Sequence, residues 1–349
     1  MLIMKKNENS EFPLVEISGN HYEMGYDLGK QISNLICEYL DWIRFKTKET
    51  KIESQKRSMS FYNLIKDYSS NYIEEITGIS EGANIPFEDA MLCQVRFGNT
   101  NNNNDGCTAF GYKEQSTLSS NLYIGQNQDM ESEFLKFGYI LKINPSISIP
   151  KIIMFTFPGQ IGYAGLNEYG ISNFANALYN YKPQTGLPHY ILKRKILEQK
   201  TLKDCKKILD NINLSEAGNV LISDSNEYID YEFYNKERYS YKTDNQNFVI
   251  HTNHYLTEEL MKFEDGTLPD SPIRLKRMIE LTKNIYGSIT IDSVKTMLAD
   301  HDNYPASICR HGADNMDSIS GYIADPKNKT FHVRKGFGCE MNWKSYKFN

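Results

Sequence analysis

The sequence pattern changes from mostly helical to β-rich at Cys107, and this change constrains the fold more than any other feature. Before it, the pattern is mostly helical: Asn20 with Glu23 resembles a capping box, and apolar residues then recur at helical spacing. After it, short β-rich runs follow one another, separated by Gly, Asn and Pro as in an antiparallel meander. Strand blocks alternating with helix pairs predict an α+β chain with two stacked, mainly antiparallel sheets flanked by helices. We expect one domain over residues 1–349.

The same patterns place the expected elements along the chain. Helices are expected from Asn20 onward and at about 57–78, 87–97, 272–285 and 291–299, with two more within 188–211. The expected strands are 13–19, 107–112, 122–127, 139–143, 151–157, 163–167, 170–176, 219–224, 227–233, 247–253, 306–310, 320–325 and 330–336.

Composition excludes several classes of protein. The 349 residues are 40% hydrophobic and 24% charged, which is ordinary for a soluble globular protein. The net charge of −5 comes without a basic block, so a nucleic-acid partner is not expected. The opening apolar run is too short for a signal sequence, and no later run is long enough to span a membrane. We therefore expect a cytoplasmic protein without a membrane partner. The six cysteines are scattered and suggest free thiols. They form no CxxC pair, so neither a zinc ribbon nor a thioredoxin motif is expected. No metal or cofactor site is predicted.

Cys107 lies where a loop becomes a strand. The polar run 99–104 precedes Asp105 and Gly106, and a β-rich run follows. This is a poor place for a packing cysteine but a good one for a cysteine whose preceding peptide bond is cut. A cysteine released as an N-terminus carries a thiol nucleophile and, in its α-amino group with a pKa of about 8, a base. The alternative is an ordinary β-edge cysteine after a turn.

Asp129 ends the run 122–129, which would pair with the Cys107 strand as a hairpin. The end of the second strand would then return to the start of the first, and the Asp129 carboxylate would lie near Cys107. Its alternative is a solvated turn aspartate. Asn253 ends another apolar strand, and its side-chain amide is a suitable oxyanion donor or, alternatively, a simple strand terminator.

Arg274 lies in the first turn of an expected helix. In DSPIRLKR, Ser271 fits the N-cap, Pro272 the first helical position and Arg274 the third. A cation there opposes the helix dipole, which suggests a specific partner such as a substrate carboxylate or the Asp129 side. The alternative is a surface arginine.

Two pairs of residues that include histidine are weaker candidates for a site. His251 and His254 point to opposite faces of a strand and cannot share one metal ion. Cys309 and His311 would share a face, so a Cys–His dyad remains an alternative nucleophile system.

Several motifs, in this order, resemble the penicillin acyltransferase-like branch of the N-terminal nucleophile hydrolases, and more distantly the bile-salt hydrolases. They span most of the chain and are GNHYEMGYDLG, DGCTAF, GQNQD, GLNEYGISNFAN, TNH, SPIRLKR and ADHDNYPASICRH.

The resemblance implies a four-layer αββα sandwich and autocatalytic cleavage between Gly106 and Cys107. Residues 1–106 would become one chain and residues 107–349 the catalytic chain. By the same resemblance Cys107 is the nucleophile, Asp129 orients its amine and Asn253 donates to the oxyanion. The remaining implied site residues are Asn176, which assists through its backbone or side chain, and Arg274, which stabilises the nucleophile end.

The implied activity is that of an autoprocessing cysteine amidohydrolase or acyltransferase. Its substrate would be a small linear amide, such as an N-acyl amino acid, a small peptide or an acylated amine, and it would need no cofactor. Bile-salt hydrolases usually have Arg where this chain has Gln126, which favours the acyltransferase-like branch. The alternatives are a non-catalytic binding protein on the same fold with an uncut chain, and a thiol hydrolase based on Cys309 and His311. The sequence leaves open whether the protein forms a homo-oligomer.

Overall fold

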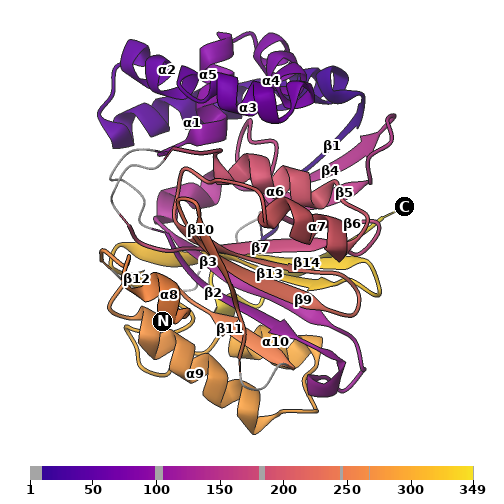
Figure 1. Ribbon diagram of the computed structural model, residues 1–349, viewed down its shortest axis with the longest axis vertical. Helices are drawn as coiled ribbons and strands as arrows, with labels where there is room; N and C mark the ends of the chain where they lie inside the picture. The colour runs from indigo at the N-terminus through magenta and orange to yellow at the C-terminus, as the bar shows by residue number, and fades with distance from the viewer. Residues whose placement is uncertain (1–9, 99–104, 181–184, 244–246, 267, 349) are drawn as a thin grey trace, which may run out of the picture.

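Two stacked β-sheets lie between two helical layers, in the order expected for an αββα sandwich (Figure 1). The computed structural model describes residues 10–98, 105–180, 185–243, 247–266 and 268–348. The polar run 99–104, which the sequence placed before Cys107, lies outside the described residues.

The first sheet, sheet A, has eight strands within the described part of the chain, in the order β1-β4-β5-β6-β7-β8-β9-β10. The strand β1 pairs with β4 in parallel, and the other neighbours are antiparallel. The strands are β1 (Leu14–Gly19), β4 (Tyr139–Pro145), β5 (Ile152–Thr156), β6 (Ala164–Asn167), β7 (Ser172–Ala177), β8 (Gly218–Ser223), β9 (Tyr228–Tyr234) and β10 (Glu237–Tyr241).

The second sheet, sheet B, is antiparallel throughout and follows the path β11-β2-β3-β13-β14-β15, with β12 paired to β13. Its strands are β2 (Gly106–Tyr112), β3 (Tyr123–Met130), β11 (Phe248–His251), β12 (His311–Ala313), β13 (Met316–Asp325), β14 (Thr330–Lys335) and β15 (Trp343–Lys347).

Helices cover the outer face of each sheet (Figure 1). On sheet A lie α1 (His21–Thr47), α2 (Lys51–Met59), α3 (Tyr62–Tyr68), α4 (Ser70–Ala83), α5 (Phe87–Val95), α6 (His189–Leu197) and α7 (Leu202–Leu209). On sheet B lie α9 (Ser271–Asn284) and α10 (Ile291–Met297), while the short α8 (Glu258–Met261) contacts β9 and β10. No helix in the described part of the chain combines the length with the apolar character that crossing a bilayer requires.

Aromatic side chains fill the space between the sheets. Phe155 and Phe174 of sheet A face Tyr322 and Phe331 of sheet B, with ring centroids 5.1–6.4 Å apart across the interface. A separate apolar cluster joins the other face of sheet B to α9 and α10, and it includes Phe110. Because β2 has buried residues on both faces, alternate side chains of this strand serve different layers.

The hairpin predicted around Cys107 is confirmed, since β2 and β3 pair antiparallel. Three local expectations are wrong. The helix expected at 57–78 is divided among α2, α3 and α4, because Ser69 is extended (φ −161°, ψ 109°) and a Thr50–Glu53 capping box starts α2 earlier. Residues 306–310 form bends rather than a strand, and pairing begins at His311. The N-cap of α9 is Asp270, so Ser271 is already the first helical residue.

The two longest helices of the outer layer on sheet A meet through glycines. A Cβ atom added at Gly25 or Gly29 of α1 would lie 1.9 or 2.4 Å from a backbone oxygen of α4, and Gly78 and Gly82 of α4 meet α1 just as closely. Two helix backbones at this separation leave no room for a side chain. Gly25 and Gly29 of the GNHYEMGYDLG motif therefore serve helix packing.

Gly78→Ala should destabilise the protein by about 2–3 kcal/mol, because the new methyl group would lie 2.2 Å from the Tyr22 carbonyl oxygen unless the helices separate. The matched control is Glu74→Ala, an exposed position on the same helix, which should change stability by about 0.5 kcal/mol or less. Calorimetric melting of both variants checks this. Equal melting temperatures would contradict the close helix contact.

Candidate active site

The β2–β3 hairpin fixes the position of Cys107. Gly106 pairs with Asp129 and Cys107 with Gln128, so the start of β2 lies beside the end of β3. Side chains alternate along the strand: Cys107 points into a pocket between the sheets, whereas Thr108 points to α9 and accepts a hydrogen bond from Arg274. Cys107 is 1% exposed.

Asn253 and Arg274 hold the backbone of Cys107 from both sides. Asn253 Oδ1 accepts a hydrogen bond from the Cys107 N–H at 2.9 Å, and Arg274 Nη1 donates to the Cys107 carbonyl oxygen at 2.6 Å. Arg274 Nη2 also donates to Asn253 Oδ1 at 2.8 Å, which joins the two side chains. The arginine is fully buried and pairs with Asp270, so the alternative of a surface arginine is wrong.

The residue before Gly106 is held as well. The Asp105 carboxylate pairs with the buried Arg96 at 2.7 Å. The backbone carbonyl oxygen of Asp105 accepts hydrogen bonds from the Tyr179 hydroxyl at 2.8 Å and from Asn253 Nδ2 at 3.4 Å. The backbone on both sides of the Gly106–Cys107 bond is thus fixed by buried polar side chains.

Asp129 lies beside Gly106 and is completely buried. Its Oδ1 accepts a hydrogen bond from Ser318 Oγ at 2.6 Å, and its Oδ2 has no hydrogen-bond partner among the described residues. Burial, opposed by the positive charges of Arg274 and Arg310, raises the pKa of the Asp129 carboxyl above its ordinary value. The solvated turn aspartate considered from the sequence is therefore wrong.

Gly106 occupies a position where a side chain would collide. An added Cβ atom would lie 2.8 Å from Arg310 Nη1 and 3.1 Å from the Asp129 Cβ atom. A side chain at this position would have to displace the Arg310 guanidinium and press against Asp129.

Two glutamines of β3 contact the Cys107 sulfur. Gln126 Nε2 and Gln128 Nε2 each lie 3.5 Å from Sγ, and Gln128 Oε1 accepts a hydrogen bond from the Tyr163 hydroxyl at 3.2 Å. These neutral donors supply no positive charge. Burial, reinforced by the negative charge of Asp129, raises the pKa of the Cys107 thiol well above its ordinary value. The thiol therefore needs a base to react near neutral pH.

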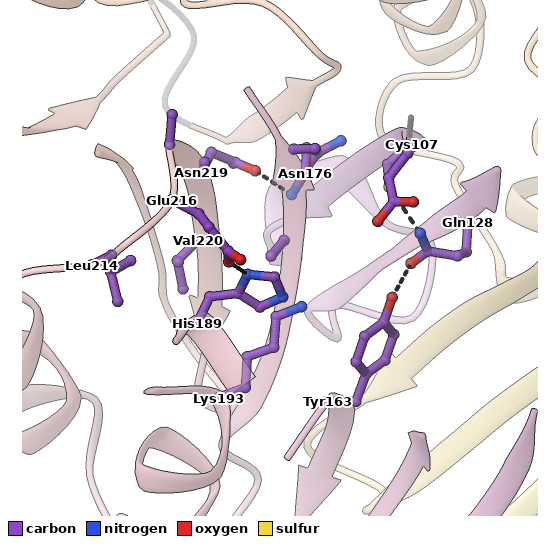
Figure 2. Close-up of a pocket in the computed structure, with 15 residues that line it drawn as sticks. Cys107, Gln128, Tyr163, Asn176, His189, Lys193, Leu214, Glu216, Asn219 and Val220 are labelled. Carbon is purple, nitrogen blue, oxygen red and sulfur yellow. Dashed lines mark hydrogen bonds and ion pairs between the residues drawn. The ribbon is translucent and has the colours of Figure 1, made fainter. Parts of the chain in front are cut away.

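The pocket beside Cys107 encloses about 590 Å³ of empty space, part of it open to solvent. Figure 2 shows Tyr163, Gln128 and Cys107 along one wall, while Lys193 points toward them from the opposite side. The lining residues come from β2, β3, β7, β8, α6 and nearby loops and are Asp105, Cys107, Gln128, Tyr163, Ala175, Asn176, Ala177, His189, Lys193, Leu214, Glu216, Ala217, Gly218, Asn219 and Val220.

Lys193 is the cation of this pocket. Its ammonium lies 4.3 Å from the centre of the Tyr163 ring. Burial is the main cause that lowers the pKa of Lys193 to about 8, with Arg96 adding repulsion and Cys107, Asp105 and Glu216 opposing the shift. Near neutral pH the pocket therefore holds a largely desolvated positive charge.

Asn176 of β7 also lines the pocket, whereas Asn253 is not among its lining residues. Its backbone N–H donates to Asn219 Oδ1 at 2.7 Å and its Nδ2 donates to the His251 carbonyl oxygen at 3.2 Å. Its Oδ1 is buried and has no hydrogen-bond partner among the described residues.

The structure brings Cys107, Asp129, Asn253 and Arg274 together and places Asn176 in the adjoining pocket. Sequence reasoning missed several polar residues around them. Two signals could have found some: the alternating glutamines of GQNQD share one strand face, and Lys193 interrupts an apolar helix. The missed residues are Arg96, Gln128, Tyr163, His189, Lys193, Glu216, Asp270 and Arg310.

Cys309 and His311, the alternative dyad, do approach each other, with the sulfur 3.6 Å from Nε2. Neither residue is among those that line the Cys107 pocket. They instead contact Cys339 and His301.

Residues 116–336 match the model of the family described as acyl-coenzyme A:6-aminopenicillanic acid acyl-transferase. The chain belongs to this family, which confirms the resemblance drawn from its motifs. As a member of an acyltransferase family it is an enzyme. The matched region contains Asp129, Asn176, Asn253 and Arg274 and begins after Cys107.

The chain is also similar to individual known proteins. The chain is 27% identical over 337 residues to the acyl-coenzyme A:6-aminopenicillanic-acid-acyltransferase 40 kDa form of Emericella nidulans, covering 92% of each chain. Among solved structures it is similar to a mutant conjugated bile acid hydrolase from Clostridium perfringens, with 14% identity, a TM-score of 0.46 and coverage of 70% of this chain and 97% of the other. It is also similar to penicillin V acylase from Agrobacterium tumefaciens, with 13% identity, a TM-score of 0.37 and coverage of 66% and 74%.

Arg274→Met should destabilise the intact chain by about 3–5 kcal/mol, because it leaves Asn253 Oδ1 and the Cys107 carbonyl oxygen buried without their cationic partner and removes one of the two arginines that pair with Asp270. The measurement is urea unfolding followed by circular dichroism, with every variant carrying Cys107→Ala so that only single chains are compared.

The control is Arg277→Met on the same helix. Arg277 is partly exposed and pairs with Asp300 and the exposed Asp302, so its loss should cost about 1 kcal/mol or less. If both variants lost the same free energy of unfolding, the buried contacts of Arg274 would contribute no more to stability than the exposed ion pairs of Arg277.

Proposed function

We propose that this protein is an N-terminal nucleophile cysteine enzyme that cuts its own Gly106–Cys107 bond and then uses Cys107 on small amides. The observation that carries this proposal is the set of buried side chains fixing the backbone on both sides of that bond. Asn253 and Arg274 hold Cys107, while Arg96 and Tyr179 hold Asp105. A purely structural cysteine would not need such an arrangement.

In the precursor, the Cys107 sulfur attacks the Gly106 carbonyl carbon as its proton passes to a base. The carbon–nitrogen bond then breaks, the nitrogen takes up a proton, and Gly106 is left as a thioester on Cys107. Water hydrolyses this thioester, which gives Gly106 a carboxylate and Cys107 a thiol beside its own new α-amine. No other reactant is consumed.

In the mature enzyme the α-amine of Cys107 is the general base for its own thiol. Asp129 is suited to hold the ammonium form, because its Oδ2 is unpaired among the described residues and lies on the Gly106 side of Cys107. The thiolate attacks a substrate carbonyl and forms a thioester acyl-enzyme. Water then completes hydrolysis, or a bound amine completes acyl transfer.

Asn253 is the proposed oxyanion donor. In the intact chain its Nδ2 donates to the carbonyl oxygen of Asp105. Departure of Asp105 after cleavage would remove that acceptor and allow the same N–H group to meet a negatively charged oxygen. Asn176 would assist through the second hydrogen of its Nδ2, and its buried Oδ1 can accept a hydrogen bond from a substrate amide.

Residues 1–106 would remain bound after cleavage. Their strand β1 pairs with β4 in sheet A, and α1 packs against both β1 and β4. The mature enzyme would therefore consist of two chains, 1–106 and 107–349.

The pocket supports an amide that carries a carboxylate, such as an N-acyl amino acid or a small peptide. Lys193 places its ammonium in the space next to Cys107, where a substrate carboxylate would replace the water lost on burial. Acylated amines without a carboxylate would bind less tightly.

Mass spectrometry of the purified protein should find two fragments, residues 1–106 and 107–349, because the thiol attacks the adjacent carbonyl. Cys107→Ala should remain one chain, and the control Cys37→Ala, which removes an exposed thiol on α1, should be cut like the wild type. An intact wild type with full amidase activity would overturn the scheme. An intact and inactive wild type would instead support a binding protein.

Lys193→Met should raise KM for N-acyl amino acids about 10–100-fold, because a charge-assisted hydrogen bond contributes about 1.5–3 kcal/mol. Steady-state kinetics on paired substrates check this: the same amide with its carboxylate replaced by a neutral carboxamide should show little change in KM. An equal loss for both substrates would place Lys193 outside carboxylate recognition.

The pH dependence should follow the same lysine. Since the pKa of Lys193 is about 8 and its cationic form is the one that binds, KM should rise as the pH passes above about 8. Lys193→Arg stays charged and should remove this rise while leaving the low-pH KM within a few-fold. A KM that is flat with pH in the wild type would contradict the assignment.

A further inference from the structure

Two cysteines and two histidines meet at one point on the outer side of sheet B, where the sequence predicted no metal site. The group consists of His301, Cys309, His311 and Cys339, and its four potential ligand atoms all lie within 4.8 Å of one another. We call it the Cys₂His₂ cluster. None of its members is among the residues that line the Cys107 pocket.

The three distances from His311 to the other ligand atoms are close to those of a tetrahedral site. His311 Nε2 lies 3.6 Å from Cys309 Sγ, 3.6 Å from Cys339 Sγ and 3.0 Å from His301 Nε2. Zinc bonds of about 2.3 Å to sulfur and about 2.0–2.1 Å to nitrogen, at tetrahedral angles, separate sulfur from nitrogen by about 3.6 Å and two nitrogens by about 3.3 Å.

The surrounding backbone supports thiolate ligands. The backbone N–H groups of Gly338 and Cys339 face the Cys309 sulfur, where they could donate hydrogen bonds to a metal-bound thiolate. The Phe337 ring stacks on His311 with centroids 4.0 Å apart, which fixes the imidazole orientation. The Cys309 N–H donates to the Asp300 carbonyl oxygen at 3.0 Å, so the loop between the first two ligands is closed.

We propose that the Cys₂His₂ cluster binds one Zn²⁺ ion in a closed structural site. Two thiolates and two imidazoles are the ligand set that zinc takes in structural sites, and four protein ligands leave no position for a substrate. On binding, each of the two thiols loses a proton to solvent, and the two thiolate charges balance the charge of the ion.

The site would join segments that are distant in sequence. His301 and Cys309 lie between α10 and β12, His311 begins β12, and Cys339 lies in the 3₁₀ turn Gly338–Glu340 between β14 and β15. Arg310 stands between two of the ligands, pairs with Asp270 at 3.0 Å, and through its N–H contacts Ser318, the partner of Asp129. The ion would therefore also fix the loop that supports the Asp129 side of the active site.

The test is the zinc content of the full-length protein, expressed with added zinc, carrying no histidine tag, and freed of loosely bound metal by gel filtration. Inductively coupled plasma mass spectrometry should find about one zinc per chain in the wild type and in the control Cys37→Ser, an exposed thiol outside the cluster. Cys339→Ser should lose most of that zinc. Chelation of the wild type should lower its melting temperature, and Zn²⁺ but not Mg²⁺ should restore it.

A second measurement uses the wild type alone, in case Cys339→Ser does not fold. After chelation, Co²⁺ should produce the visible absorption of a tetrahedral thiolate complex, and Zn²⁺ should displace it. A wild type without zinc that gives no such spectrum would overturn the proposal, as would a Cys309–Cys339 disulfide in its place. Zinc content is independent of peptide-bond cleavage, so failure of either proposal leaves the other standing.

Discussion

The contact between Arg274 and the backbone of Cys107 is the interaction on which the rest of the site depends. A guanidinium that is fully buried needs acceptors around it, and here they are the Cys107 carbonyl oxygen, Asn253 and Asp270. The same set of bonds fixes Asn253 with its oxygen toward the Cys107 N–H. Removing any partner leaves a buried polar group unsatisfied, so each member constrains the others.

The strands and helices of the sandwich position the residues that make this contact. The β2–β3 hairpin places Asp129 beside Gly106, β11 carries the chain to Asn253, and α9 on the outer face of sheet B directs Arg274 inward. Sheet A closes the other side, where α6 provides Lys193. The proposed nucleophile thus comes from sheet B, the proposed oxyanion donor from just after its strand β11, Arg274 from the helices outside that sheet, and Lys193 from a helix on sheet A, so the proposed chemistry depends on how these layers stack.

Local patterns predicted much of this arrangement. Successive β-rich runs predicted the hairpin, and a hairpin returns Asp129 to the vicinity of Cys107. A proline-containing helix start drew attention to Arg274. What the sequence could not predict depends on contacts between distant elements. Lys193 reaches the pocket only because α6 packs on sheet A. The Cys₂His₂ cluster has no local spacing signal, because a whole β-hairpin separates Cys339 from the other ligands.

Peptide mapping of an acyl-enzyme is the most direct measurement of whether Cys107 acts as an N-terminal nucleophile. The enzyme is mixed with an N-acyl substrate, quenched in acid to preserve thioesters, and digested for mass spectrometry. The account predicts the acyl mass on a peptide whose first residue is Cys107 with an unblocked amino group. An acyl group on Cys309, or on a peptide that still spans Gly106 and Cys107, would contradict it.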